Sequence, residues 1–279
     1  MIGMAARTWF ITGTSRGFGR EWAAAALRRG DRVVGTARDP STLDDLAREY
    51  GDSFLAPALD VTDREAVFET VRRAHDHFGQ LDIVVNNAGY GHFGMVEEVS
   101  EQEARDQIET NLFGALWVTQ AALPFLRAQR SGHIVQVSSI GGISAFIEVG
   151  MYHASKWALE GISQSLAQEV RDFGIHVTLI EPGGFSTDWG GPSAKHSERL
   201  DAYAEIHDAS DQRRAQGRQT AGDPVASSEA IMRVVDADEP PLRVFFGTAP
   251  LAIAEADYER RLATWREWQP VAELAQGGR

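Results

Sequence analysis

The chain has 279 residues, of which 43% are hydrophobic and 24% charged, the balance of a folded globular protein rather than a disordered one. Its formal net charge of −13 disfavours nucleic acid as a partner, and the lack of cysteine excludes disulfides and thiolate chemistry. No apolar run reaches the roughly 18 residues of a membrane-spanning helix. We therefore expect a cytoplasmic protein with no membrane, nucleic-acid or metal partner.

Strand and helix patterns alternate along the chain. Short runs rich in β-branched residues predict seven strands, at Thr8–Thr12, Arg32–Thr36, Phe54–Leu59, Ile83–Asn86, His133–Ser138, His176–Glu181 and Arg243–Gly247. Helical patterns lie between them, near Gly17–Arg29, Ser41–Tyr50, Asp63–Phe78, Glu101–Arg130, Met151–Phe173 and Pro224–Asp236. Strands separated by helices indicate a parallel sheet. The sequence thus predicts a single α/β domain over 1–279, a Rossmann-like doubly wound fold with a parallel sheet of about seven strands flanked by helices.

Two segments depart from this alternation. Residues 183–223, after the sixth strand, are polar and rich in Gly, Ser, Asp, Arg and Gln. Ligands bind at the carboxyl edge of open α/β sheets, so we expect a substrate lid here, with a disordered surface insertion as the alternative. Residues 250–269 predict a C-terminal amphipathic helix, whose apolar side would pack on the domain or on another subunit.

A glycine-rich turn over residues 12–19 joins the first strand directly to the first helix. Glycines allow the backbone to turn tightly and to approach a pyrophosphate, whose charge is met by the N-terminus of the following helix. We therefore expect a dinucleotide site, with contacts from Gly13, Ser15, Arg16, Gly17, Phe18 and Gly19.

The end of the second strand bears on the choice between NAD and NADP. An acidic residue there would bind the adenosine ribose of NAD, whereas a basic residue accommodates the 2′-phosphate of NADP. This chain has Arg38, and Arg16 can reach the same region, so we expect NADP(H) to be preferred. Asp39 leaves NAD(H) as an alternative, because its carboxylate could turn toward the ribose.

Tyr152 and Lys156 lie four residues apart in a long helical pattern, which places both side chains on one face. The ordinary pKa of tyrosine, about 10, makes it a poor acid or base near neutral pH. A nearby positive charge is expected to lower this pKa by roughly 1–3 units, so that Tyr152 can exchange a proton with a substrate oxygen. Of the 27 basic residues only Lys156 and Lys195 are lysines, so a lysine at this position is informative.

Together these residues resemble the short-chain dehydrogenase/reductase family, from Thr8 to about Gly247. Residues 12–19 match its TGxxxGxG element, and residues 86–89 match its NNAG element. The resemblance implies that the pair after the third strand contacts the adenine ring and that the NNAG element lines the cofactor groove. The residues concerned are Asp60, Val61, Asn87, Ala88 and Gly89. We expect Asn87 to contact the cofactor directly and, with equal weight, Asn86 to have a structural role.

The resemblance also implies a catalytic tetrad. Ser139 lies thirteen residues before Tyr152, as in many members of the family, and would hydrogen-bond the substrate carbonyl. Asn111 would hold a water that joins Lys156 to solvent. Tyr152 and Lys156 also contact the cofactor, and the nicotinamide end would be contacted by the PGxxxT element, represented by Pro182, Gly183 and Thr187.

These residues predict an oxidoreductase, a carbonyl reductase or alcohol dehydrogenase that transfers hydride between nicotinamide C4 and a small-molecule substrate. The expected pocket wall favours an apolar or aromatic substrate and contains Phe93, Met95, Ile143, Phe146, Ile147, Val149, Phe185 and Trp189. Glu148 is the one acidic group near this wall, and we expect it to be a solvated loop residue.

The overall resemblance is to the branch that contains hydroxysteroid and retinol dehydrogenases. It implies a homodimer or homotetramer formed through the long helices Glu101–Arg130 and Met151–Phe173. Two other interpretations stay open: an NAD-preferring dehydrogenase, and a sensor of the same fold that binds dinucleotide without catalysis.

Overall fold

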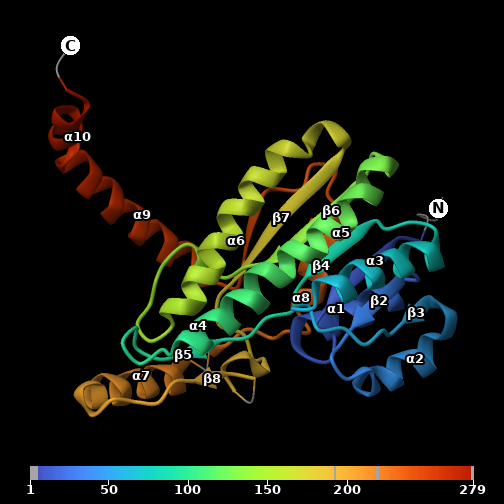
Figure 1. Cartoon of the computed structure of the whole chain (residues 1–279), viewed down its shortest axis with the longest axis horizontal. Helices are drawn as coiled ribbons and strands as arrows, with labels where there is room; N and C mark the ends of the chain where they lie inside the picture. The colour runs from blue at the N-terminus through green and yellow to red at the C-terminus, as the bar shows by residue number, and fades with distance from the viewer. Residues whose placement is uncertain (1–5, 192, 218–219, 278–279) are drawn as a thin grey trace.

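The computed structural model describes residues 6–191, 193–217 and 220–277. Its centre is a parallel sheet in the order β3-β2-β1-β4-β6-β7-β9 (Figure 1). The strands are β1 (Thr8–Thr12), β2 (Arg32–Thr36), β3 (Phe54–Leu55), β4 (Ile83–Asn86), β6 (Gly132–Val137), β7 (Ile175–Pro182) and β9 (Arg243–Phe246). The chain winds outward from β1 to β3 and then returns to β4, so the strand order reverses between β1 and β4. The doubly wound sheet of seven strands is therefore confirmed.

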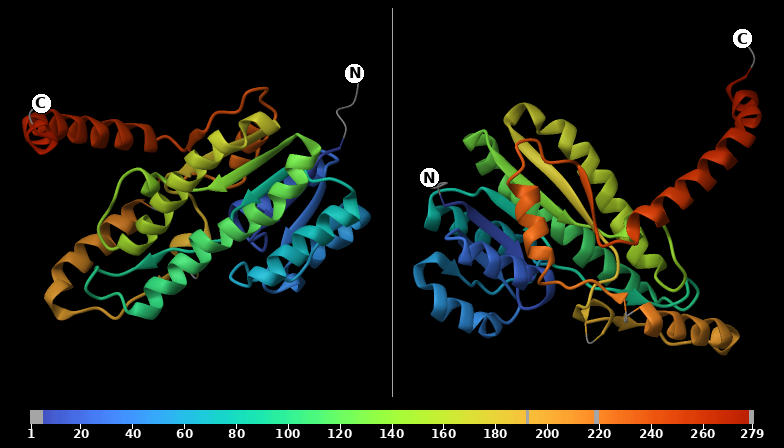
Figure 2. Two further views of the ribbon diagram at one scale, coloured as in Figure 1. Left: turned by 45° about the horizontal axis from the view of Figure 1, so that its top comes forward. Right: turned by 180° about the vertical axis from the view of Figure 1, so that it is seen from behind.

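Helices cover both faces of the sheet (Figures 1 and 2). On one face lie α1 (Gly17–Arg28) and α8 (Ser227–Val235), and on the other lie α3 (Arg64–Phe78), α5 (Gly114–Gln129) and α6 (Gly150–Glu169). Side chains alternate along a strand, so Trp9 belongs to the first core layer and Phe10 to the second. A short helix, α2 (Asp44–Tyr50), follows β2.

Two expected elements are interrupted. The strand expected over Phe54–Leu59 stops at Leu55, and only a single bridge between Ala37 and Ala58 continues the pairing. The helix expected over Glu101–Arg130 is divided into α4 (Glu101–Ile108) and α5 by a π-helical turn, η3 (Glu109–Phe113). A π-helical turn inside an α-helix often marks a functional site, and this turn contains Asn111.

The segment expected to be a lid, 183–223, is folded over its described part; residues 192, 218 and 219 lie outside the described residues. A short strand, β8 (Lys195–His196), pairs with β5 (His92–Phe93), and a helix, α7 (Ala204–Gly217), follows. The sequence did not predict α7, because its buried residues are His207 and Ser210 rather than an apolar stripe.

The C-terminal helix is present as α9 (Pro250–Glu267), followed by α10 (Gln269–Gln276). Its first turns contact the domain, where Ala254 packs against Ile140 and Ile143. Beyond them both helices project away from the domain (Figure 1), and Trp265 and Trp268 are 58% and 61% exposed. The expected packing on the domain is therefore limited to the start of α9. No helix in the described ranges is both long enough and apolar enough to cross a membrane.

Candidate active site

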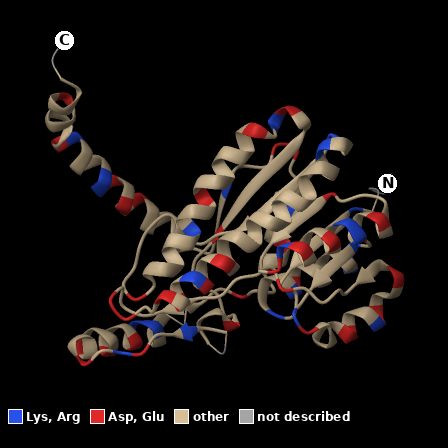
Figure 3. Ribbon diagram, viewed as in Figure 1, with Lys and Arg blue, Asp and Glu red and all other residues tan. Residues whose placement is uncertain are grey.

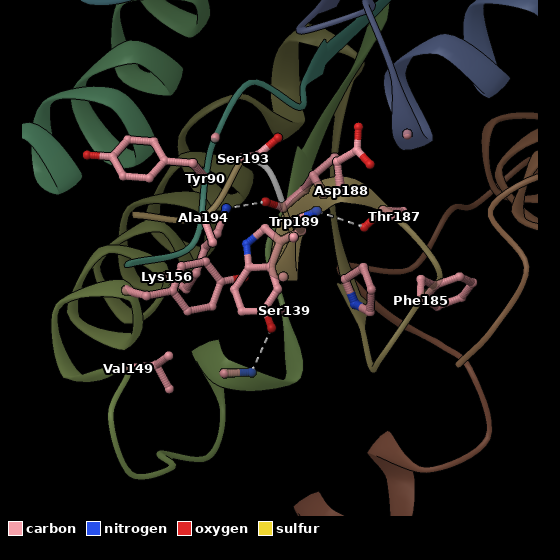
Figure 4. Close-up of a pocket in the computed structure, with 18 of the residues that line it drawn as sticks. Tyr90, Ser139, Val149, Lys156, Phe185, Thr187, Asp188, Trp189, Ser193 and Ala194 are labelled. Carbon is pink, nitrogen blue, oxygen red and sulfur yellow. Dashed lines mark hydrogen bonds between the residues drawn. The ribbon is translucent and has the colours of Figure 1, made fainter. Parts of the chain in front are cut away.

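A cavity of about 1390 Å³ opens at the carboxyl edge of the sheet. The structure brings nearly all the predicted site residues to its wall, from the glycine-rich turn to the start of α6. Figure 4 shows part of this wall, including Ser139, Lys156 and Thr187. These are Gly13, Ser15, Arg16, Gly17, Phe18, Arg38, Asp60, Val61, Asn87, Ala88, Gly89, Ser139, Tyr152, Lys156, Pro182, Gly183 and Thr187. Two predicted residues, Gly19 and Asn111, lie behind the wall rather than on it.

Gly19 shapes the glycine-rich turn from behind. Gly13 and Gly17 have φ angles of +69° and +59°, which residues other than glycine rarely adopt. A methyl group on Gly19 would lie 2.5 Å from both Asn87 Nδ2 and the carbonyl oxygen of Gly13. Gly19 is therefore required for close packing, and its expected direct contact with the cofactor stays a prediction.

Asn87 fastens the turn to the neighbouring strand. Its Nδ2 donates hydrogen bonds of 2.9 Å to the carbonyl oxygens of both Thr12 and Gly13. Asn86 has a structural role of the same kind, because its Nδ2 donates to Thr119 Oγ1 at 2.9 Å in the core. The side chain of Asn87, which also reaches the cavity wall, thus holds the turn in shape.

The two residues that bear on cofactor choice are placed differently. Arg38 is exposed and lines the cavity. The carboxylate of Asp39 instead accepts hydrogen bonds from the backbone N–H and hydroxyl of Ser41, at 3.0 and 2.7 Å, which lower its pKa. Asp39 thereby caps the turn at Pro40–Leu43. Arg16 lies 3.4 Å from Asp188 across the cavity mouth.

The chemically reactive side chains meet where β6 ends and α6 begins. Tyr152 and Lys156 occupy successive turns of α6 and are 6% and 7% exposed. The Lys156 Nζ donates to the carbonyl oxygen of Val137 at 2.7 Å and lies 5.8 Å from the centroid of the Tyr152 ring. Ser139 starts the short turn η4 (Ile140–Gly142), and its Oγ accepts the N–H of Gly141 at 2.9 Å (Figure 4).

The pKa values of this pair differ from the sequence expectation. Burial raises the pKa of Tyr152 to about 12, although its hydrogen bond with Ser139 acts in the opposite direction. Burial also lowers the pKa of Lys156 to about 8, and the charge of Glu160 opposes that change. The expected lowering of the tyrosine pKa by lysine is wrong for the protein alone, because loss of solvation dominates. At neutral pH Tyr152 is a protonated phenol.

Asn111 links the loop after β4 to α6 through hydrogen bonds to Tyr90 and Ser155. Its Oδ1 accepts the N–H of Tyr90 at 3.1 Å, and its Nδ2 donates to the carbonyl oxygen of Tyr90 at 3.0 Å and to Ser155 Oγ at 3.2 Å. Ser155 in turn donates to the carbonyl oxygen of Tyr152 at 2.6 Å. The side chain of Asn111 therefore fixes the loop after β4 to α6, and the water expected at Asn111 stays a prediction.

An aromatic wall closes the substrate end of the cavity. The Trp189 ring lies 4.8 Å from the Tyr152 ring and 5.5 Å from the Phe93 ring, measured between centroids. Of the expected wall residues, six line the cavity, namely Phe93, Phe146, Ile147, Val149, Phe185 and Trp189. Met95 and Ile143 do not; Ile143 instead packs against Ala254.

Glu148 was expected to be a solvated loop residue, and this expectation is wrong. It is 4% exposed, has a left-handed φ of +67°, and is bonded to His207 and Arg214 of α7. The other ring nitrogen of His207 lies 2.7 Å from Glu98 Oε1. Acidic and basic residues lie close together around α7 (Figure 3), and these bonds fasten α7 beside the cavity that it lines. The sequence could not show this, because the partners lie 59 or more positions apart.

Comparison with known proteins agrees with this geometry. The sequence matches the short chain dehydrogenase family over residues 7–198. It is 39% identical over 268 residues to "Oxidoreductase BOA17" of Botryotinia fuckeliana, covering 95% of this chain and 98% of the relative.

Two solved structures extend the likeness. A short-chain dehydrogenase from Streptomyces avermitilis has a TM-score of 0.91 at 39% identity, covering 98% of this chain and all of the other. An alcohol dehydrogenase from Thermococcus sibiricus, complexed with 5-hydroxy-NADP, has a TM-score of 0.73 at 25% identity, covering 88% and 97%. The chain therefore belongs to the short-chain dehydrogenase/reductase family and is an oxidoreductase with a nicotinamide cofactor.

Proposed function

We propose that the protein is an NADP(H)-dependent carbonyl reductase, able to run in reverse as an alcohol dehydrogenase, for substrates that are apolar or aromatic. The observation that carries the proposal is that Ser139, Tyr152 and Lys156 share one cavity with the glycine-rich turn. A dinucleotide extended along this cavity would place its adenine end beside Asp60 and Val61 and its nicotinamide end beside Tyr152 and Lys156.

The residues present fit such a cofactor. Left-handed glycines at 13 and 17 expose backbone N–H groups at the start of α1, where a pyrophosphate would be stabilised. Val61 and Asp60 would border the adenine, while Pro182, Gly183 and Thr187 would border the nicotinamide. When bound, the cofactor supplies or accepts the hydride.

The preference for NADP(H) follows from Arg38 and Asp39. An exposed guanidinium on the cavity wall is suited to a 2′-phosphate. The carboxylate that would favour the ribose of NAD is already bonded to Ser41. The 5-hydroxy-NADP complex of the Thermococcus sibiricus relative is consistent with this preference.

Tyr152 and Ser139 would handle the substrate oxygen. The Ser139 Oγ accepts the Gly141 N–H, and its own hydrogen would bond the substrate carbonyl in place of Tyr152. Tyr152, protonated at neutral pH, donates a proton to that oxygen as hydride reaches the carbon. A raised phenol pKa favours the reductive direction, because the acid form is fully populated. Lys156 holds a positive charge near the phenol and would bind the cofactor ribose.

The substrate class follows from the wall opposite these groups. Trp189 and Phe93 present aromatic faces beside Tyr152, so a flat or apolar carbonyl compound would fill the space between them. Such a substrate is in keeping with the hydroxysteroid and retinol dehydrogenase branch of the family.

The test is NADPH consumption against a panel of aliphatic, aromatic, quinone and steroid carbonyls, with Tyr152→Phe as the blank. We expect consumption with apolar members of the panel and at least a hundredfold loss in the variant, the scale of general acid catalysis. Equal consumption by the two proteins would refute the assignment of Tyr152.

A further inference from the structure

A cluster of ionisable side chains lies buried behind the catalytic wall. Glu160 is one turn after Lys156 on α6, and Glu181 is near the end of β7; their side chains are 8% and 1% exposed. Arg243, at the start of β9, donates from Nε to Glu160 Oε2 at 2.9 Å and lies 3.3 Å from Glu181 Oε1. Two carboxyl groups thus share one guanidinium, outside the cavity and unused by the proposed reaction.

The two carboxyl groups are close enough to share a proton, because each affects the pKa of the other. Among the described residues, Glu160 Oε1 and Glu181 Oε1 make no hydrogen bond, although Ser138 lies beside Glu160 and Arg243 Nε lies 3.3 Å from Glu181 Oε1. A proton shared by Glu181 and Glu160 would remove the repulsion between two buried charges. In agreement, burial and the charge of Glu160 raise the pKa of Glu181 to about 8. Burial also raises the pKa of Glu160, against hydrogen bonds from Ser138 and Arg243 that lower it. A pair that shares one proton keeps one negative charge.

The negative charge lies next to parts of the catalytic site. Positions four apart on a helix are neighbours, so Glu160 and Lys156 lie on the same face of α6. The charge of Glu160 opposes the lowering of the Lys156 pKa by burial. A methyl group on Gly142 would lie 3.0 Å from Glu160 Cγ and 2.7 Å from Ser138 Oγ. The Glu160 side chain therefore packs against the η4 turn, which Ser139 begins. Glu181 directly precedes Pro182 of the expected nicotinamide contact.

We propose that Glu160 is a positioning residue: its carboxylate, held by Arg243 and by a proton on Glu181, keeps Lys156 charged and supports the turn that carries Ser139. In the described structure, the titratable groups that face Lys156 are Tyr152 and Glu160 on α6. Arg243 on β9 and Glu181 on β7 face Glu160. The inference rests on the proposed function, yet it concerns a property of Lys156 that is measurable without turnover.

The experiment uses the scarcity of lysine. Protein labelled with ¹³C-lysine gives signals from Lys156 and Lys195 alone, and the Lys195→Arg variant assigns them. The pKa of Lys156 is read from its ¹³Cε shift between pH 6 and 11. It is compared in the wild type, in Glu160→Gln, and in the double variant Glu160→Gln with Glu181→Gln. The double variant is needed because Glu181 would ionise against Arg243 once Glu160 is neutral. Glu169→Gln, an exposed change on the same helix, is the matched control.

We expect the pKa of Lys156 to fall by about one unit in the double variant, by less in Glu160→Gln, and not at all in Glu169→Gln. The single variant decides the question if the double variant does not fold, as judged by its circular dichroism. An unchanged Lys156 pKa in folded protein that lacks the Glu160 charge would overturn the proposal.

The pH dependence of kcat is a second measurement that tests the proposal. If Lys156 must be charged, the alkaline limb of the kcat profile moves to lower pH with the lysine pKa. For a fall from about 8 to about 7, kcat at pH 8 drops about fivefold, while kcat at pH 6 changes little. A uniform loss of kcat at every pH, with the lysine pKa unmoved, would indicate a merely structural role and contradict the proposal. Failure of the proposed function is distinguishable, because it leaves wild-type protein without Tyr152-dependent NADPH oxidation while the lysine titration stays measurable.

Discussion

The substitution Gly19→Ala tests whether the glycine-rich turn binds a dinucleotide. The added methyl group would lie 2.5 Å from Asn87 Nδ2 and from the carbonyl oxygen of Gly13, so the Asn87 side chain must move. Two hydrogen bonds from that side chain are then disturbed, each worth about 1 kcal/mol. Overpacking of the turn adds at least about 1 kcal/mol of strain.

The substitution therefore makes the conformation of the turn that fits a pyrophosphate less favourable by about 3 kcal/mol in total. We therefore expect the Kd for NADPH to rise roughly a hundredfold, since each 1.4 kcal/mol is tenfold in affinity. The assay is titration of the protein with NADPH, followed by the fluorescence of the nicotinamide.

Gly161→Ala is the matched control for this substitution. A methyl group at this position on α6 meets nothing within 4 Å in the described structure. Replacing glycine by alanine inside a helix should raise stability by up to about 1 kcal/mol and leave the Kd unchanged. If Gly19→Ala bound NADPH within threefold of the wild type, the packing argument for the turn would be refuted.

Two further outcomes are expected. Replacing Arg38 by Gln should weaken NADPH binding about tenfold, the loss of one charge-assisted hydrogen bond, and leave NADH binding unchanged in parallel titrations; equal losses would contradict the NADP(H) preference. His207 links the lid to Glu98 and Glu148, which raise its pKa above the usual 6.5. Its contribution to lid stability is thus complete below pH 6.5 and lost as pH rises through the raised value. Amide exchange of α7 should show greater opening at high pH, after correction for intrinsic exchange, and His207→Gln should abolish that dependence; an equal pH dependence in the variant would count against the latch.

The sheet and the reactive groups were predictable because both depend on local patterns. Strand composition located six of the seven strands to within about one residue at each end, and the four-residue spacing placed Tyr152 and Lys156 on one helix face. The glycine-rich turn was predictable because it lies between β1 and α1.

The remaining features depend on contacts between distant residues. The helix α7 was missed because its buried side chains, His207 and Ser210, are polar, so hydrophobic periodicity gives no signal. The burial of Glu148 depends on residues of that helix. The pKa of Tyr152 was misjudged because spacing reveals the nearby lysine but not the loss of solvent around the phenol.

The central claim is that hydride transfer takes place in the cavity beside Tyr152. The most direct test is a single-turnover reaction with NADPH carrying two deuterium atoms at C4, with a carbonyl compound that the panel identifies, followed by mass spectrometry of the alcohol. The account predicts deuterium on the former carbonyl carbon with the wild type, and at least a hundredfold slower transfer with Tyr152→Phe at saturating NADPH. Transfer at the wild-type rate in that variant, or an alcohol without deuterium, would contradict it.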